Sequence, residues 1–562
     1  MNIPPRRSHV LTLTLVAALC AHLAACGDGE NPSRIAAGAA TATQPPTNTP
    51  SITRTATQVP SNTRASTSTP TPSPTETATE TATSTPSRTA TATPGPVRGM
   101  GVAIPSIEGP ISGGAGQPFV ATTTFDLAEV GYSAAEYFMS GTATSYTNTA
   151  PLTLDGKWSV APASTAAYKT RILIYRPIDG NRFNGTVIVE WLNVSGGLDA
   201  GPDWIAAHVQ LIREGFAWVG VSAQFAGVES GTSLVGLQPM PLKMVDPERY
   251  GSLVHPGDSF SYDIFSQAGQ AIRRPSAPTS LSDLRIEKVI AVGESQSAFR
   301  LVTYIDGVHP LADMYDGYLV HSRGSLGTPP LSESPQAVIN VPGSVPIRDD
   351  LDVPVLTFET ETDLGLLQFV PARQPDTDRF RLWEVAGTAH ADVYTTAGSA
   401  DRGDDPSVAN LVVTTMPVAG INCLDPINSG PQHFVLDAAF SALNQWVVRG
   451  TPPPVAARIV TDSSNAIVRD SNGIALGGIR TPQVDVPIAT LSGEGQVGSL
   501  FCLIFGTTVP FDDVKLASLY PDHETYVTLY DQAADRVTAA GFLVPADAAL
   551  LKAAAASSDI GG

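Results

Sequence analysis

A serine in a predicted tight turn is the strongest candidate for a reactive side chain in this sequence. Ser295 lies in Gly293-Glu294-Ser295-Gln296-Ser297, between an apolar run at residues 289–292 and a segment of helix-compatible composition. Small flanking residues let a strand turn sharply into a helix, which exposes the hydroxyl at the helix N-terminus. Ser297 stands where glycine is usual in such a turn, but it is also small. The segment therefore predicts a nucleophilic serine, with an ordinary serine in a turn as the alternative.

A base and an acid follow Ser295 in the order that this chemistry needs. A predicted strand at residues 354–358 leads into Glu359-Thr360-Glu361-Thr362-Asp363, and the next strand leads to His390. A neutral histidine takes the serine proton, and a carboxylate on its other ring nitrogen fixes the tautomer. We predict His390 as general base and Asp363 as acid, with Glu361 as the alternative acid. A solvated acidic loop or a calcium site is the competing interpretation of these carboxylates.

An oxyanion formed at the serine needs two backbone N–H donors. One is expected from Gln296, the residue after the nucleophile, and the other from the loop that follows an earlier strand. That loop begins at Trp191, so Asn193 or Val194 is the predicted second donor.

Three further side chains are candidates for a substrate pocket: Trp191, His321 and Arg323. His321 ends the predicted strand that follows the Ser295 turn, which places it at the active edge of a parallel sheet. Structural roles are equally compatible with the sequence for all three, and for Trp191 that role is a packed aromatic ring. The other histidines lack metal-ligand spacing, so no metal site and no cofactor are predicted.

Alternating strands and helices must position these residues. Apolar runs predict strands, and 3.6-residue periodicity predicts helices at residues 204–214 and 433–449. This alternation predicts an α/β fold, with a mainly parallel central sheet covered by helices on both faces. The predicted strands occupy residues 170–175, 186–192, 216–221, 288–292, 317–321, 354–358 and 379–385.

Two long insertions, at about residues 397–428 and 456–513, are too long for plain connections. We predict that they form a cap over the site. They contain Cys423 and Cys502, and an isolated cysteine pair in an exported protein indicates a disulfide.

The N-terminus predicts export. Residues 1–26 contain two arginines, an apolar run and a small-residue end at Cys26, as in a lipoprotein signal peptide, with an ordinary signal peptide as the alternative. Residues 27–98 are rich in Thr, Ser and Pro and predict a disordered stalk, and a single elaborated domain then spans residues 99–562. We therefore predict a cell-envelope lipoprotein, periplasmic or surface-facing, that meets the membrane only through a lipid on Cys26.

The net charge of the chain restricts the kinds of molecule that it is expected to bind. The formal net charge of −20 disfavours binding to nucleic acid, which depends on clustered Lys and Arg. A small neutral ester suits this acidic chain better than an anionic one.

Several segments together resemble a family of bacterial alpha/beta hydrolase domain-containing proteins of largely unassigned substrate. The resemblance runs from about Val102 to Ala556, and it implies one hydrolase domain with Ser295 and His390 in the catalytic places. It does not decide between Asp363 and Glu361. The segments that carry it are residues 190–195, 293–298, 321–324, 361–363, 384–392 and 505–511.

These observations predict a serine hydrolase that cleaves a carboxylic ester through an acyl-enzyme. An amidase or peptidase and an acyltransferase share the same triad. A surface protein that binds a ligand or glycan without catalysis is the alternative from another class. The distance between Ser295 and His390 separates the two classes.

Overall fold

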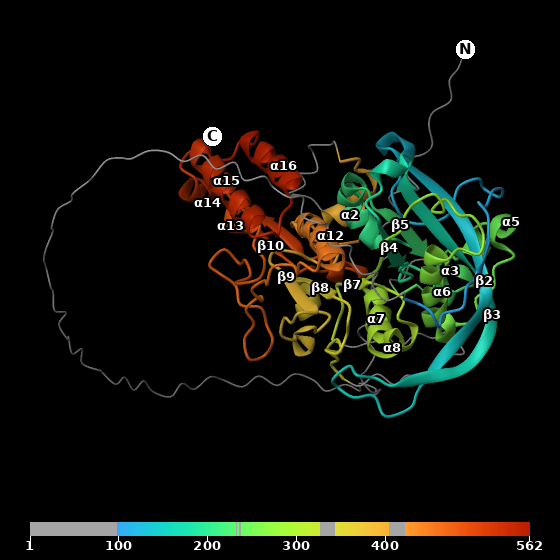
Figure 1. Ribbon diagram of the computed structural model, residues 1–562. Helices are drawn as coiled ribbons and strands as arrows, with labels where there is room; N and C mark the ends of the chain where they lie inside the picture. The colour runs from blue at the N-terminus through green and yellow to red at the C-terminus, as the bar shows by residue number, and fades with distance from the viewer. Residues whose placement is uncertain (1–97, 232, 235–237, 326–342, 404–421) are drawn as a thin grey trace, which may run out of the picture. The chain divides into compact units, whose positions relative to one another are not determined.

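A nine-stranded sheet forms the centre of the protein (Figure 1). The computed structural model describes residues 98–231, 233–234, 238–325, 343–403 and 422–562. The strand order is β1-β2-β3-β5-β4-β6-β7-β8-β9. The strands are β1 (Ser106–Glu108), β2 (Tyr132–Asn148), β3 (Val160–Pro177), β4 (Thr186–Trp191), β5 (Ala217–Val221), β6 (Lys288–Glu294), β7 (Gly317–His321), β8 (Val355–Thr360) and β9 (Phe380–Val385).

Parallel pairing unites the six strands from β4 to β9, whereas β1, β2 and β3 pair antiparallel at one side. This confirms the predicted mainly parallel sheet. The register aligns Glu294 at the end of β6 with His321 at the end of β7. It also aligns Thr360 of β8 with Val385 of β9. The loops that follow β6, β7, β8 and β9 therefore leave the sheet along the same edge.

Helices cover both faces of the sheet, as predicted. The helices α2 (Pro202–Glu214) and α12 (Gln432–Arg449) pack on the face that carries Ile188, whereas α6 (Ser261–Arg273) and α7 (Gln296–Thr303) pack on the face that carries Val187 and Val189 (Figure 1). Successive residues of β4 thus point to opposite cores, as strand geometry requires. Because both of their faces are buried, the parallel strands from β4 to β9 are largely apolar.

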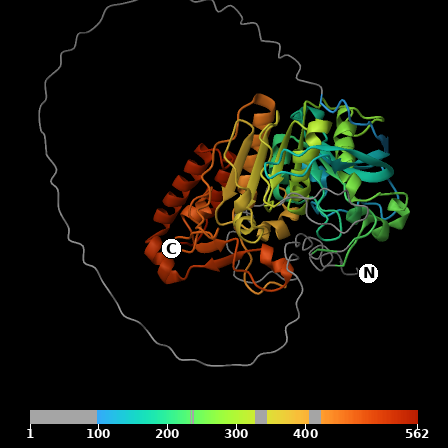
Figure 2. The ribbon, with the colours of Figure 1, turned by 90° about the horizontal axis from the view of Figure 1, so that it is seen from below.

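A helical layer that the sequence predictions missed follows at the C-terminus. The helices α14 (Asp513–Leu519), α15 (His523–Ala539) and α16 (Pro545–Ala556) form a separate core of tyrosines and alanines. Figure 2 shows these red elements beside the yellow strands of the sheet. The shorter helices are α3 (Phe225–Val228), α4 (Leu242–Val245), α5 (Pro247–Tyr250), α8 (His309–Ala312), α9 (Glu361–Gly365), α10 (Val393–Ala397) and α13 (Pro482–Asp485).

The described parts of the predicted insertions pack against β9 and the loop that follows it. A second sheet, formed by β10 (Ala489–Ser492) and β11 (Thr507–Pro510), lies within the insertion at 456–513. A disulfide joins Cys423 and Cys502, as predicted, and so connects the two insertions. Most of the first insertion, residues 404–421, lies outside the described residues.

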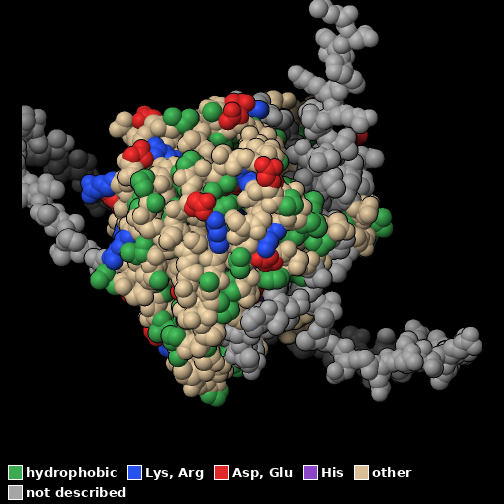
Figure 3. All heavy atoms as spheres, turned by 90° about the vertical axis from the view of Figure 1, so that its right-hand side faces the viewer, with side chains coloured by type: hydrophobic (Ala, Val, Ile, Leu, Met, Phe, Trp, Pro, Cys, Tyr) green, Lys and Arg blue, Asp and Glu red, His purple; other side chains and the backbone are tan. Residues whose placement is uncertain are grey.

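The predicted signal peptide with Cys26 and nearly all of the predicted stalk at 27–98 lie outside the described residues. Within the described part of the chain, we find no helix that is both long and apolar enough to cross a membrane. On the face shown in Figure 3, basic side chains lie singly among acidic and uncharged ones.

Candidate active site

Ser295 occupies a strained turn between β6 and α7. Its backbone angles are φ 58° and ψ −121°, in a region that a non-glycine residue rarely adopts. A side chain at Gly293 would meet the backbone of Ser297 at 3.2 Å, which explains why a small residue precedes the turn. The turn projects Ser295 from the sheet edge and leaves its side chain at the start of α7, as the sequence predicted.

His390 lies within hydrogen-bond distance of Ser295. The Nε2 atom of His390 is 2.8 Å from Oγ of Ser295, and its Nδ1 atom is 2.6 Å from Oδ1 of Asp363. All three side chains are buried, with 5% of Ser295 exposed. They follow β6, β9 and β8, so three separate strand ends bring them together. In this geometry His390 can accept the serine proton while Asp363 orients its ring.

Local hydrogen bonds hold Asp363 in place. Asp363 lies in the first turn of α9, where its Oδ2 accepts hydrogen bonds from the backbone N–H and the hydroxyl of Thr360 at 2.6 and 2.7 Å. This capping box leaves Oδ1 directed at His390. The cap therefore fixes the carboxylate rotamer at the histidine.

Glu361, the alternative acid, has other partners. It accepts hydrogen bonds from the N–H groups of Gly387 at 2.6 Å and Gly493 at 3.1 Å, and it pairs with Arg469 at 2.9 Å. Burial raises the pKa of Glu361, and Arg469 opposes that shift. Glu361 thus ties the His390 loop to the second insertion, and the structure places Asp363 and not Glu361 at the histidine.

Glu294 is a further acidic residue at the site, and the sequence predictions gave it no role. Its Oε1 lies 3.1 Å from Nε2 of His390, the same nitrogen that faces Ser295. The side-chain amide of Asn193 lies 3.4 Å from Oε2 of Glu294 and 3.2 Å from its backbone carbonyl. Burial raises the pKa of Glu294, while the nearby His390 acts in the opposite direction. Two carboxylates therefore bracket the imidazole ring of His390.

The predicted oxyanion donors need one correction. Gln296 begins α7 directly after Ser295, as expected for the first donor, and its side chain exchanges hydrogen bonds with Gln224. The N–H of Asn193, however, donates to the carbonyl of Ala200 at 2.8 Å. Asn193 and Ala200 form a two-bond bridge that closes the loop, so the Asn193 N–H is not directed at an oxyanion. The assignment of the Gln296 and Val194 N–H groups as the two oxyanion donors stays a prediction.

A narrow pocket opens beside the His390 ring and includes His321 in its lining. Its volume is about 20 Å³, room for one or two water molecules. His321 Nδ1 lies 2.9 Å from Oδ1 of Asp203, and its Nε2 lies 3.1 Å from the side-chain amide of Gln432. His321 therefore forms a second histidine–carboxylate pair. The lining residues are Pro202, Ile205, Ala206, Glu294, His321, His390, Ala391, Thr395 and Gln432.

Glu190 fixes the helix that forms one wall of this pocket. Its buried carboxylate accepts hydrogen bonds from the N–H groups of Asp203 and Trp204 at 2.9 and 3.0 Å. A carboxylate at a helix N-terminus satisfies free N–H groups and the helix dipole. These bonds hold Asp203, the second residue of α2, in contact with His321.

Trp191 and Arg323, the other predicted pocket residues, do not line this pocket. Trp191 ends β4 on the far face of the sheet, where its ring packs on Tyr262 and Phe265. Arg323 is buried and donates to the carbonyl groups of Gly324 and Val345. Alternation along β4 turns Trp191 to the face covered by α6, and Arg323 holds its own loop, so contact of either residue with a substrate stays a prediction.

The insertions pack next to His390. The N–H of Ala391 donates to the carbonyl of Ile504 at 3.0 Å, and a small apolar cluster joins Ala391 with Leu198, Phe501 and the disulfide. The part of the predicted cap that the structure describes thus supports the loop of His390. The nine residues that line the pocket all come from outside residues 456–513.

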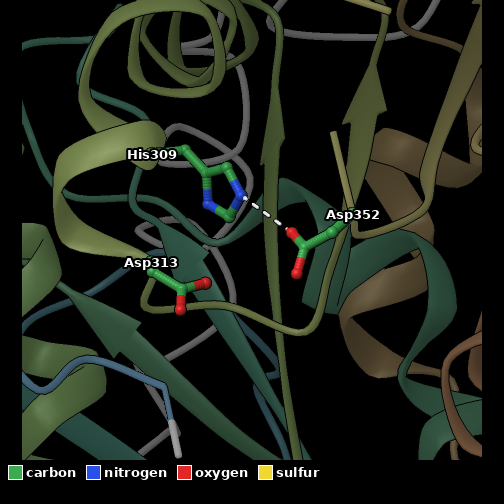
Figure 4. Close-up of side chains that lie close together, drawn as sticks. All are labelled: His309, Asp313 and Asp352. Atoms are coloured by element: carbon green, nitrogen blue, oxygen red, sulfur yellow. Dashed lines mark ion pairs between the residues drawn. The ribbon is translucent and has the colours of Figure 1, made fainter. Parts of the chain in front are cut away.

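One group of side chains among the described residues has metal-ligand character. His309 and Asp313 precede β7, Asp352 precedes β8, and the three lie together, with 3.8 Å between His309 Nε2 and Asp352 Oδ1 (Figure 4). The guanidinium of Arg98 pairs with both aspartates. His309 and Arg98 hold the pKa of Asp352 well below its ordinary value. Arg98 thus neutralises the charge of the two aspartates, and we interpret the group as an ion-pair cluster.

Comparisons with solved structures find esterases of low similarity. An esterase from Rhizomucor miehei has 13% identity and a TM-score of 0.27, and the match covers 57% of this chain and 85% of that chain. A thermostable esterase from Pseudomonas putida has 11% identity and a TM-score of 0.26, with 49% and 79% covered. A structure of Est1E from Butyrivibrio proteoclasticus with ferulic acid has 10% identity and a TM-score of 0.23, with 39% and 86% covered. A search of curated proteins found no match.

The family comparison covers most of the chain. The family model of the alpha/beta hydrolase domain matches residues 107–553, which include the whole sheet from β2 to β9 and every residue of the candidate triad. The strand order, the turn after β6 and the positions of the acid and histidine after β8 and β9 agree with this match. The chain therefore belongs to the alpha/beta hydrolase domain family.

Proposed function

We propose that this protein hydrolyses a carboxylic ester through an acyl-enzyme on Ser295. His390 takes the proton from Oγ as the serine attacks the ester carbonyl, and Asp363 stabilises the imidazolium that forms. The same proton then moves from His390 to the departing alcohol. Water attacks the acyl-serine in a second step and releases the acid.

The observation that carries this proposal is the buried chain of two short contacts, 2.8 Å from Ser295 to His390 and 2.6 Å from His390 to Asp363. A protein that only binds a ligand needs no such chain. The strained angles of Ser295 point the same way, because strain of about 1–3 kcal/mol persists only where the surrounding structure enforces it.

A small neutral ester is the proposed substrate class. The pocket beside His390 holds about 20 Å³, so it admits only a small part of a substrate. The carboxyl groups of Glu294 and Asp203 lie at or behind its wall and disfavour an anionic group.

Labelling of the full chain with a fluorophosphonate probe tests the proposal. Wild-type protein should label, whereas Ser295→Ala and His390→Ala should not. Ser297→Ala is the matched control, because Ser297 is a buried serine of the same turn and should leave labelling intact. A folded wild-type protein that fails to label would refute an activated serine. If the wild-type protein labels, a panel of p-nitrophenyl esters and anilides separates an esterase from an amidase.

We also propose that the chain is exported and anchored through Cys26. The disulfide between Cys423 and Cys502 supports an oxidising compartment. Metabolic labelling with a fatty acid, in wild type and Cys26→Ser, tests the anchor. Equal labelling of the two proteins would refute it.

A further inference from the structure

We infer that Glu294 is a second catalytic carboxylate, which holds the hydrolytic water against His390 during release of the acyl group. This inference rests on the proposed function and adds a residue to its second step. The chemistry that it assigns to Glu294 differs from that of Asp363, because the two carboxylates contact opposite nitrogens of the same ring.

Glu294 lies at the nitrogen that exchanges protons. Nε2 of His390 has Oγ of Ser295 at 2.8 Å and Oε1 of Glu294 at 3.1 Å. Asp363 contacts Nδ1, which keeps its proton throughout the reaction. Of the two carboxylates, only Glu294 can therefore share a water molecule with Nε2.

Deacylation requires a group that orients the attacking water. Once Ser295 is acylated, its oxygen carries no proton, and His390 must take the next proton from water. A water that donates one hydrogen to Nε2 can donate its second hydrogen to Oε1 of Glu294, since the two acceptor atoms are 3.1 Å apart. Two acceptors then orient the water oxygen toward the acyl carbon, which is the kind of positioning that lowers a barrier.

The pocket provides a place for this water. Glu294 and His390 line the same pocket, whose volume of about 20 Å³ fits one or two waters. Asp363 is not among its lining residues. Glu294 is 4% exposed, so its carboxylate is largely shielded from bulk solvent.

Neighbouring groups keep the carboxylate in position. The backbone of Glu294 ends β6 in register with His321, and Asn193 donates its side-chain amide to the Glu294 carbonyl. His321, held by Asp203, lines the same pocket beside Glu294. The rigid end of a buried strand thus supports Glu294, as it supports Ser295.

The step balances without any other reactant. Water gives one proton to Nε2 of His390, and its oxygen forms a bond to the acyl carbon. The tetrahedral intermediate then breaks its bond to Oγ of Ser295, and Oγ recovers the proton from Nε2. Glu294 accepts a hydrogen bond throughout and is unchanged at the end.

Burst kinetics of Glu294→Gln with p-nitrophenyl acetate test this role in the full chain. Release of p-nitrophenol in the burst reports acylation, and the following linear phase reports deacylation. We expect acylation to stay within about threefold of wild type and deacylation to fall roughly tenfold to a hundredfold. The acyl-enzyme should accumulate, so intact-protein mass spectrometry should find one acetyl group on the variant during turnover.

Glu359→Gln is the matched control. Glu359 is a buried glutamate at the end of β8, outside the pocket lining, and burial raises its pKa well above the ordinary value. Glutamine keeps the shape of this side chain, and the change lies outside the pocket, so both phases should match wild type. The fluorophosphonate labelling rate of each variant reports whether the fold and the Ser295–His390 pair are intact.

Two outcomes would overturn the role of Glu294 alone. The first is that both phases match wild type. The second is an equal fall of both phases and of fluorophosphonate labelling, which would mean that Glu294 only supports the fold. A wild-type protein that neither labels nor forms an acyl-enzyme would instead overturn the proposed function and this inference together.

Discussion

Replacing Asp363 with asparagine tests which acid serves His390. Oδ1 of Asp363 lies 2.6 Å from Nδ1 of the buried His390. Asparagine keeps the shape of the side chain but removes the charge. The neutral amide no longer stabilises the imidazolium, and its N–H donors favour the tautomer in which Nε2 carries the proton. In that tautomer His390 cannot accept the proton of Ser295.

The expected loss is large. The same substitution in a Ser-His-Asp protease lowers kcat by roughly 10⁴-fold, a magnitude that applies here because the contact is short, buried and made to the same ring nitrogen. At about 1.36 kcal/mol for each tenfold change, this is roughly 5 kcal/mol of transition-state stabilisation. KM should change little, because Asp363 lies outside the pocket lining.

Glu361→Gln provides the matched comparison, since it makes the same chemical change two residues away. Glu361 bonds the N–H groups of Gly387 and Gly493 and pairs with Arg469, which Glu494 also contacts at 2.7 Å. Removing its charge should lower the free energy of unfolding by about 1–3 kcal/mol. Its kcat should stay within about tenfold of wild type, because the positions of Ser295 and His390 change only indirectly.

Steady-state kinetics with a p-nitrophenyl ester measure both variants, and thermal unfolding followed by circular dichroism measures their stability. The assignment of Asp363 would be refuted if Asp363→Asn retained more than a tenth of wild-type kcat. It would also be refuted if a folded Glu361→Gln lost activity to the extent expected for Asp363→Asn.

Three further predictions concern stability. Cys423→Ser should lower the free energy of unfolding by up to about 4.5 kcal/mol, because the bridge to Cys502 spans a sequence separation of 79. Urea titrations measure this, and a reductant should destabilise wild type but not the variant. Asp392→Asn should stabilise the fold, because burial raises the pKa of Asp392 from 3.8 to about 6, so its contribution to stability falls as the pH rises through that window. The gain is at most roughly 3 kcal/mol at about pH 8 and about half of that at pH 5, and equal gains at both pH values would contradict it. Dialysis against EDTA should leave the melting temperature unchanged, because Arg98 already pairs with Asp313 and Asp352; a clear fall would indicate a bound metal ion.

The framework of the site could be predicted from the sequence because its strands are buried on both faces. Such strands appear as continuous apolar runs, and the predicted runs at 186–192, 288–292 and 354–358 overlap β4, β6 and β8. Parallel strands end at one edge of the sheet. The order of the strands in the chain was therefore enough to predict that Ser295, the acidic loop and His390 lie near one another.

Side-chain direction within a turn could not be predicted. Glu361 and Asp363 are two residues apart in α9, so they point to nearly opposite sides of the helix, and the capping box with Thr360 decides which one faces His390. The bridge between Asn193 and Ala200 is likewise a tertiary feature.

The helix α15, in contrast, could have been predicted from the sequence, because Tyr526, Tyr530, Ala533 and Val537 follow helical spacing.

Buried carboxylates at the active edge favour an enzyme over a protein that only binds a ligand. Glu294 and Asp363 are each at most 4% exposed, and burial raises the pKa of Glu294. Removing charged groups from water is unfavourable, and apolar residues of similar size often stabilise a fold better. A binding protein could therefore replace these groups and gain stability. Their cluster around one imidazole, beside a serine in a strained turn, follows directly if the protein must form and discharge an imidazolium at that position.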